Sequence, residues 1–161
     1  MMNIAQIRPS DIANGSGVRV SIFVSGCKHN CPNCFNKEYQ DFSYGKVFDK
    51  KDEDKLFDLL SKTEIKGLTL LGGEPMEHPI DLSNMLIRLK NRLDEKSLKK
   101  DFWIYSGFTL EEICEDEDKL ALLKECDILV DGPFIEELKD PSLKFRGSKN
   151  QRIIEINKLN L

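Results

Sequence analysis

The sequence has no long apolar run and no excess of basic residues. No stretch approaches the ~20 apolar residues that span a bilayer, and residues 1–15 lack the charged-then-apolar order of a signal peptide. The formal net charge of −4 argues against a nucleic-acid partner, because phosphate binding needs a concentrated basic face. We therefore expect a cytoplasmic protein whose partners are proteins or small molecules, with neither a membrane nor a nucleic acid among them.

Histidine is scarce, and no Ser/His/Asp arrangement for nucleophilic catalysis is evident. The two histidines, His29 and His78, are predicted to be loop or surface residues. The glycine pair at 72–73 is not followed by the Lys-Ser/Thr of a phosphate loop. No low-complexity tract or Pro/Gly-rich linker divides the 161 residues, so we expect one domain that spans residues 1–161.

Apolar periodicity predicts strands that alternate with helices. Alternating valine and isoleucine in residues 18–24 indicate a strand. Further strands are predicted in the segments 67–75, 101–108 and 126–134, with a last short one in "RIIEI". Helices are predicted over residues 52–61, over residues 81–93, and from a capping box at Thr109 and Glu112 to Lys124, with a break in the last. Residues 36–50 show no clean period and are predicted to be a loop.

Four of the apolar runs end in the same way, with a glycine just past the strand. These endings are "FVSG", "TLLGG", "IYSG" and "ILVDG". Strands that alternate with helices predict an α/β fold with a mostly parallel sheet or a partial barrel, and the carboxyl ends of parallel strands share one edge, where ligands bind. Glycine there lets a ligand approach the backbone, although each glycine also suits a simple turn.

Three of the five cysteines crowd the loop after the first predicted strand. Cys27, Cys31 and Cys34 have the spacing C-x3-C-x2-C, and an odd cysteine count without a signal peptide disfavours a disulfide framework. Thiolates select iron–sulfur clusters, zinc or copper(I). Structural zinc needs a fourth ligand, yet His29 would strain the loop, and the other two cysteines, Cys114 and Cys126, are expected in the core. In a four-iron cluster, three cysteines leave one iron open to an exogenous ligand.

The cysteine spacing, followed by "GGEP" at residues 72–75, resembles the radical S-adenosylmethionine (SAM) superfamily. The resemblance implies that the three cysteines hold a 4Fe-4S cluster whose open iron chelates SAM. It also implies which residues contact the nucleotide. The methionine end would lie at Gly72, Gly73 and Glu74, the adenosine end at Asn33, Cys34 and Phe35, and two further cofactor contacts at Ser106 and Asp131. For Asp131, a role in turn formation explains the sequence equally well.

Residues 11–154 further resemble the activating proteins of anaerobic (class III) ribonucleoside-triphosphate reductase, through "WIYSGF", "LVDGPF" and "DPSLKFRGSKNQRII". Two departures are Asn33, where the superfamily often has an aromatic residue, and "GSG" at residues 15–17 in place of "GPG". The resemblance implies an incomplete (β/α) barrel. It implies an electron from a flavodoxin-like donor, reductive cleavage of SAM, and a 5′-deoxyadenosyl radical that takes a hydrogen atom from a glycine of the reductase.

Two other functions remain compatible with the sequence. One is radical chemistry of the same kind, in an activase for another glycyl-radical enzyme or an enzyme acting on a small molecule. The other is a zinc-binding interaction module without catalysis. Residues 145–151, with Arg146, Lys149 and the neighbouring Arg152, could form part of a docking surface or a solvated basic segment.

Overall fold

The fold is built on one open sheet of seven strands. The computed structural model describes residues 1–161, and the strands follow the order β3-β1-β2-β4-β5-β6-β7. They are β1 (Asn3–Asp11), β2 (Arg19–Val24), β3 (Lys46–Val47), β4 (Gly67–Gly72), β5 (Asp101–Tyr105), β6 (Ile128–Asp131) and β7 (Arg152–Glu155). Strands β3 and β7 are the two edges, so the sheet does not close on itself.

The expected α/β class is confirmed, but the sheet is mixed rather than mostly parallel. Strands β2, β4, β5 and β6 are parallel, whereas the pairings β1–β2, β1–β3 and β6–β7 are antiparallel. No element is predicted from the sequence for β1. Its register with β2 shifts twice, between Ile4 and Gln6 and between Arg8 and Asp11. Such bulges interrupt the two-residue alternation by which a strand is recognised.

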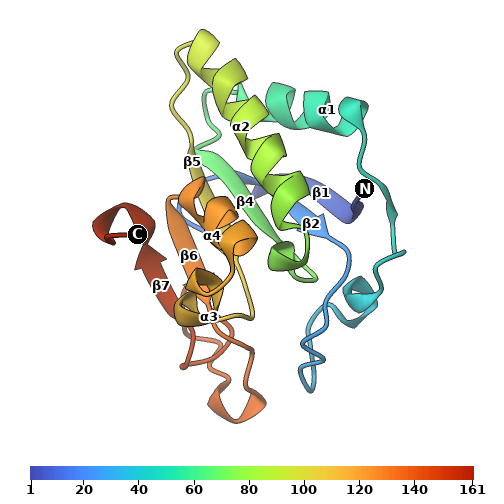
Figure 1. The fold of residues 1–161 in the computed structure, drawn as a ribbon, viewed down its shortest axis with the longest axis vertical. Coiled ribbons are helices and arrows are strands. Elements are labelled where there is room, and N and C mark those ends of the chain that lie inside the picture. Colours follow the sequence, from blue (N-terminus) through green and yellow to red (C-terminus); the bar gives the residue numbers. More distant parts are fainter.

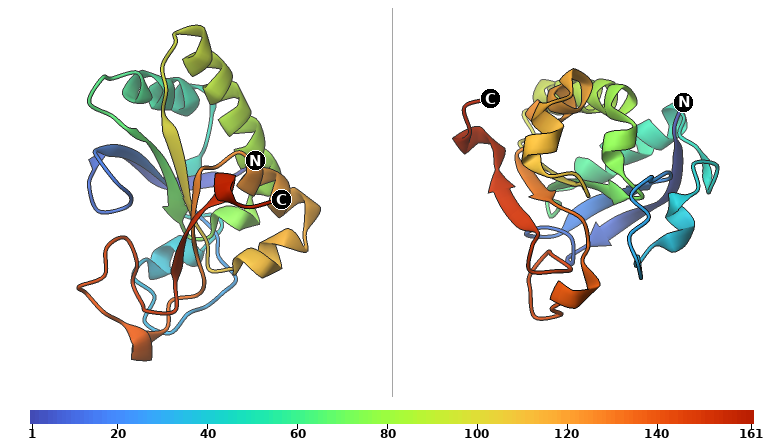
Figure 2. Two further views of the ribbon diagram at one scale, coloured as in Figure 1. Left: turned by 90° about the vertical axis from the view of Figure 1, so that its left-hand side faces the viewer. Right: turned by 60° about the horizontal axis from the view of Figure 1, so that its bottom comes forward.

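Four helices cover one face of the sheet (Figures 1 and 2). They are α1 (Lys50–Leu60), α2 (Pro79–Glu95), α3 (Leu110–Cys114) and α4 (Glu117–Lys124). The predicted helices are confirmed, including the capping box at Thr109 and the break before α4, whose N-cap is Asp116. Their apolar faces and the strands form one cluster of 25 buried residues. None of the helices combines the length and apolar composition needed to cross a membrane.

Residues 36–50, predicted to be a loop, contain two short elements. A 3-10 helix, η1 (Lys37–Gln40), follows the cysteine loop, and β3 then pairs with β1 over two residues. Elements this short carry no detectable period. The other 3-10 turns are η2 (Pro75–Glu77), η3 (Glu136–Leu138) and η4 (Ile156–Lys158).

The parallel strands bring the predicted glycine turns to one edge of the sheet. Pairing of β2 with β4, of β4 with β5 and of β5 with β6 aligns their carboxyl ends. Residues 25–36, which we call the cysteine loop, and residues 132–151, which we call the C-terminal loop, both leave the sheet at this edge, at the bottom of Figure 1. The shared edge expected from the sequence is therefore present.

At the opposite end of the parallel strands, a buried arginine ties three of them together. The Arg19 side chain is fully buried, and one guanidinium nitrogen lies 2.6 Å from the Asp101 carboxylate. Its Nε donates to Thr69 Oγ1 (2.8 Å), and another nitrogen donates to the Leu68 carbonyl (3.1 Å). Arg19 therefore joins the first residue of β2 to β4 and β5.

Replacing Asp101 with alanine should lower the free energy of unfolding by about 3 kcal/mol, because it leaves the buried Arg19 guanidinium without its counter-charge. Chemical denaturation measures the change. The matched control is Lys66→Ala, which removes a 51% exposed ammonium 4.0 Å from the same carboxylate. That variant should lose less than about 1 kcal/mol. Equal losses in the two variants would contradict this account.

Candidate functional site

The cysteine loop carries three free thiols on a segment without regular secondary structure. Cys27, Cys31 and Cys34 are all partly exposed. Backbone hydrogen bonds hold the start of the loop, from Gly26 N to Tyr39 O (2.7 Å) and from Cys27 N to Gln40 O (3.1 Å). Two asparagines, at positions 30 and 33, take left-handed backbone conformations with φ of 52° and 58°, which asparagine tolerates better than most residues.

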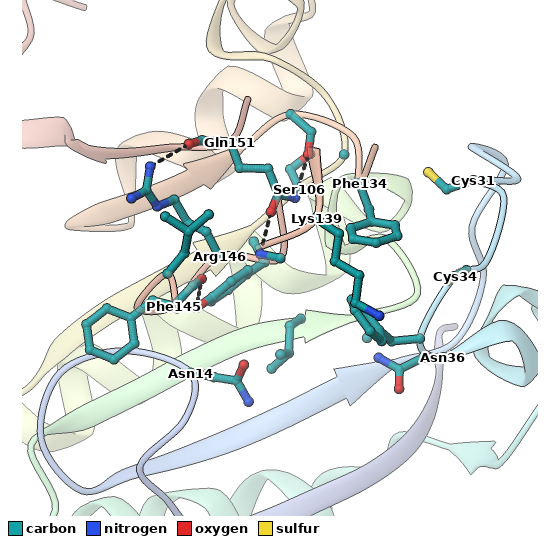
Figure 3. Close-up of a pocket in the computed structure, with 18 of the residues that line it drawn as sticks. Asn14, Cys31, Cys34, Asn36, Ser106, Phe134, Lys139, Phe145, Arg146 and Gln151 are labelled. Atoms are coloured by element: carbon teal, nitrogen blue, oxygen red, sulfur yellow. Dashed lines mark hydrogen bonds between the residues drawn. The ribbon is translucent and has the colours of Figure 1, made fainter. Parts of the chain in front are cut away.

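All three thiols line one end of a cavity of about 500 Å³. Phe35, the glycine pair 72–73 and Ser106 line it as well. The far wall comes from the C-terminal loop, with Phe145 and Arg146 facing across from Cys31 (Figure 3). The cavity volume lies within the usual range of small-molecule sites, about 300–1,000 Å³. The structure therefore brings the cysteines and the glycine pair together in one potential binding site.

The glycine turn after β4 touches the cysteine loop through backbone atoms. Gly73 N donates to Val24 O (3.0 Å), and Glu74 N donates to Gly26 O (2.8 Å). A Cβ atom on Gly73 would lie 2.6 Å from the Gly26 carbonyl oxygen and 2.7 Å from that of Tyr39. Only glycine leaves room for this approach, so the turn and the loop start form one rigid backbone unit.

The Glu74 side chain turns away from the cavity and is 1% exposed. Its Oε1 accepts from Met76 N (2.9 Å) and Ser106 Oγ (2.9 Å), and its Oε2 accepts from Gly107 N (2.7 Å). The same Oε2 lies 2.8 Å from Nε2 of His29, and this hydrogen bond raises the pKa of the histidine. Within the "GGEP" turn, Gly72 and Gly73 line the cavity, whereas the Glu74 carboxylate makes its bonds inside the protein.

Of the other predicted cofactor contacts, Phe35 lines the cavity and Asn33 does not. Phe35 is 64% exposed, and its ring centroid is 4.8 Å from that of Phe134 across the cavity wall. Asn33 does not line this cavity but a neighbouring cleft, which it shares with Lys37 and with Cys31 and Cys34.

Asp131 is buried and does not line the cavity. Its Oδ1 accepts from Arg152 Nε (3.0 Å), and its Oδ2 accepts from Leu110 N (2.8 Å). Arg152 also lies 2.8 Å from Glu111, and the hydrogen bond from Arg152 lowers the pKa of Glu111 to about 2. Of the three basic residues considered for docking, Arg152 is therefore used inside the chain, Lys149 is exposed, and Arg146 lines the cavity.

Several lining residues are not identified from the sequence. They are Asn14, Phe134, Lys139, Phe145 and Gln151. Four of them belong to the C-terminal loop, which looks irregular and polar in the sequence. Only their position in the sequence could have pointed to the cavity, because the C-terminal loop follows the last of the four strand–glycine endings.

The remaining cysteines lie outside the cavity. Cys126 is buried, as predicted, and its pKa is raised by burial. The prediction that Cys114 is a core residue is wrong, because it is the exposed last residue of α3, where Ile113 is the buried side chain. His29 is a loop residue, as predicted, but its side chain is only 19% exposed and is bonded to Glu74.

The three thiols of the loop are soft sulfur donors of the kind that iron–sulfur clusters and zinc take. Burial raises the pKa of Cys27 to about 11 and also raises the pKa of Cys31. In the metal-free chain these thiols keep their protons at neutral pH, and a bound metal would displace them. No group of three or more His, Cys, Asp or Glu side chains is placed to share one metal ion, as structural zinc requires. In a polynuclear cluster each thiolate binds a different iron, so the ligands stand farther apart.

Comparison with known proteins agrees with this donor set. A family model described as a 4Fe-4S single cluster domain matches residues 13–154. The anaerobic ribonucleoside-triphosphate reductase-activating protein of Vibrio cholerae is 45% identical over 154 residues, which cover 94% of this chain and 97% of the relative. The chain belongs to the family of these activating proteins. A relative of the same name from Escherichia coli K12 is 41% identical over 152 residues (93% and 96%), and one from Enterobacteria phage T4 is 37% identical over 154 residues (94% and 93%).

The residues at the cavity fit the 4Fe-4S cluster of the family model. The family match includes the three loop cysteines, the "GGEP" turn and the whole C-terminal loop. The donors offered to the cavity by the cysteine loop are soft thiolates, the ligands that iron–sulfur clusters take. Neither Cys114 nor Cys126 lines the cavity as a fourth thiolate.

Gly73→Ala should separate the turn from the cysteine loop. Its Cβ would collide with two backbone carbonyls, and we expect a loss of about 2 kcal/mol in the free energy of unfolding from overpacking, together with reduced iron content after reconstitution. Denaturation and iron analysis measure the two effects. Gly147→Ala is the control, because its Cβ would meet aromatic side chains at 3.1 Å or more. Normal iron content in Gly73→Ala would show that the close approach is unimportant.

Proposed function

We propose that this chain is a radical SAM activase for anaerobic ribonucleoside-triphosphate reductase. In this proposal Cys27, Cys31 and Cys34 hold a 4Fe-4S cluster, SAM occupies the cavity, and a glycine of the reductase large subunit loses a hydrogen atom to become a glycyl radical. The observation that carries the proposal is that three thiols and the glycine turn line one nucleotide-sized cavity. The names of the relatives support the choice of partner.

The cofactor carries the chemistry, and the protein positions it. When bound, the cluster would supply one low-potential electron to SAM, whose cleavage yields methionine and a 5′-deoxyadenosyl radical that takes the hydrogen atom from the glycine α-carbon. No side chain has to act as acid or base. The task of the chain is to bind SAM in one orientation and to keep water away from it. Apolar side chains in the cavity lining, among them Leu71, Phe134 and Leu143, suit that task.

The cavity suggests where each end of SAM binds. Gly72 and Gly73 offer backbone atoms to the methionine end, beside the cysteines. Phe35 and Phe134 form a tilted aromatic pair on which an adenine can stack. Ser106 also lines the cavity, and its Oγ donates to Glu74. We assign Asp131 to holding Arg152 rather than to the ribose, because both of its carboxylate oxygens are engaged.

The open sheet leaves space for a partner. We interpret the seven strands with free edges β3 and β7 as the incomplete barrel of the superfamily, in a single domain. A glycine of the reductase would enter where the C-terminal loop borders the cavity, at the end away from the cysteines. A flavodoxin-like protein is the proposed electron donor. Free thiols without disulfides suit a reducing compartment, so we place the protein in the cytoplasm.

Reconstituted protein incubated with dithionite and SAM should form 5′-deoxyadenosine. Serine at Cys27, Cys31 or Cys34 should reduce this product to background, because each substitution removes one iron ligand. Cys114→Ser is the matched control, since that thiol is exposed and lies outside the cavity, and it should retain activity. A colourless protein that holds one zinc and forms no 5′-deoxyadenosine would instead support the zinc-binding module.

A second experiment tests the partner. Mixing the reconstituted protein, SAM and reductant with the anaerobic reductase should give a glycyl radical doublet in electron paramagnetic resonance. The signal should be absent when the reductase carries alanine at its radical glycine. Formation of 5′-deoxyadenosine without this signal would point to another glycyl-radical enzyme or to a small-molecule substrate.

A further inference from the structure

Beyond its hydrogen-bonded start, the cysteine loop packs into the body of the protein through the ring of His29, whose side chain is 19% exposed. This residue lies midway between Cys27 and Cys31, and its Nε2 is 2.8 Å from Glu74 Oε2. Its ring packs edge-on against Phe108, with centroids 4.4 Å apart. By contrast, the neighbouring Lys28 is 76% exposed at the side chain and lies 3.7 Å from Glu77.

The niche that receives His29 is held by contacts that do not involve the histidine. Three donors fix the Glu74 carboxylate: Met76 N from its own turn, and Ser106 Oγ and Gly107 N from the segment after β5. Each carboxylate oxygen has two lone-pair positions. The three internal bonds fill three of the four positions, and His29 of the cysteine loop takes the fourth.

Gly107 supplies the space for the ring. A Cβ atom on this residue would lie 2.7 Å from His29 Cδ2 and 2.8 Å from Nε2. Gly107 does not have a positive φ. Its backbone therefore accepts alanine without strain, and glycine at this position serves the fit of the imidazole rather than the turn.

We propose that His29 is a positioning residue that latches the cysteine loop onto the glycine turn and the segment after β5. The latch fixes where Cys27 and Cys31 stand relative to Gly72 and Gly73. The significance of that placement for catalysis rests on the proposed function, in which the cluster and SAM must meet at this point. The latch itself is a property of the metal-free chain and can be tested there.

The first test measures thiol alkylation in metal-free protein by mass spectrometry at fixed pH. His29→Ala should raise the alkylation rates of Cys27 and Cys31 by about threefold or more, because the loop opens locally. Cys114, which is exposed, serves as the internal standard, and Cys126 reports global unfolding. Lys28→Ala is the matched control and should leave the rates unchanged. Unchanged rates in His29→Ala would overturn the proposal.

The second test uses the collision at Gly107. Gly107→Ala should displace an unaltered His29 and reproduce the alkylation pattern of His29→Ala. In the His29→Ala background the same substitution should add nothing, because the ring it collides with is gone. Additive effects in the double variant would refute the latch. His29→Gln, which can donate an N–H to Glu74, should restore part of the protection and serves as the comparison if His29→Ala exposes Cys126.

In reconstituted protein, the change in the electron paramagnetic resonance spectrum of the reduced cluster on addition of SAM should be weakened in His29→Ala and partly restored in His29→Gln. Intact protein that forms no 5′-deoxyadenosine would contradict the proposed function but leave the alkylation result, and so the latch, standing. Normal alkylation in His29→Ala would remove the latch and leave the function standing.

Discussion

The buried carboxylate of Glu74 is the constraint on which the site depends. An ionised carboxylate removed from water costs several kcal/mol unless hydrogen bonds compensate it. Its donors come from three segments that are distant in the sequence: the turn after β4, the segment after β5, and the cysteine loop through His29. The native state is therefore most stable when all three segments are in place. The hydrogen bond between His29 and Glu74 thus also holds the cysteine loop beside the glycine turn.

The two ends of the parallel strands have different roles: the amino ends stabilise the sheet, and the carboxyl ends form the rim of the cavity. At the amino end, Arg19 holds β2, β4 and β5 together with buried charged and polar contacts. The carboxyl end then does not have to supply bulky side chains for cohesion. It can carry glycines such as Gly73, at which two backbone segments approach within a distance that no Cβ allows. A ligand that binds to backbone atoms needs a sheet end that does not move and a rim with few bulky side chains, and the carboxyl ends of these strands provide both.

Local patterns predicted the local features correctly. The apolar spacing of α2 and the capping box at Thr109 depend on residues within a turn of one another, and both are present. The three cysteines and the glycine pair were also identifiable, because their chemistry is carried by spacing. What the sequence did not indicate depends on distant partners. His29 meets Glu74 across 45 residues, and β1 is recognisable only through its irregular pairing with β2.

The far wall of the cavity is preorganised by the C-terminal loop, which no local pattern revealed. Side-chain amides bridge it, with Asn150 Nδ2 donating to Pro133 O (2.7 Å) and Gln151 Nε2 donating to Gly132 O (3.0 Å). The Tyr105 hydroxyl on β5 donates to Phe145 O (2.7 Å), which fixes the loop to the sheet. These bonds form without a ligand. The wall is therefore already ordered, and little conformational entropy is lost there when a ligand binds. The thiol end is held by His29 and the far end by this amide network. A molecule that contacts both ends of the cavity therefore meets two segments that are anchored by separate sets of hydrogen bonds.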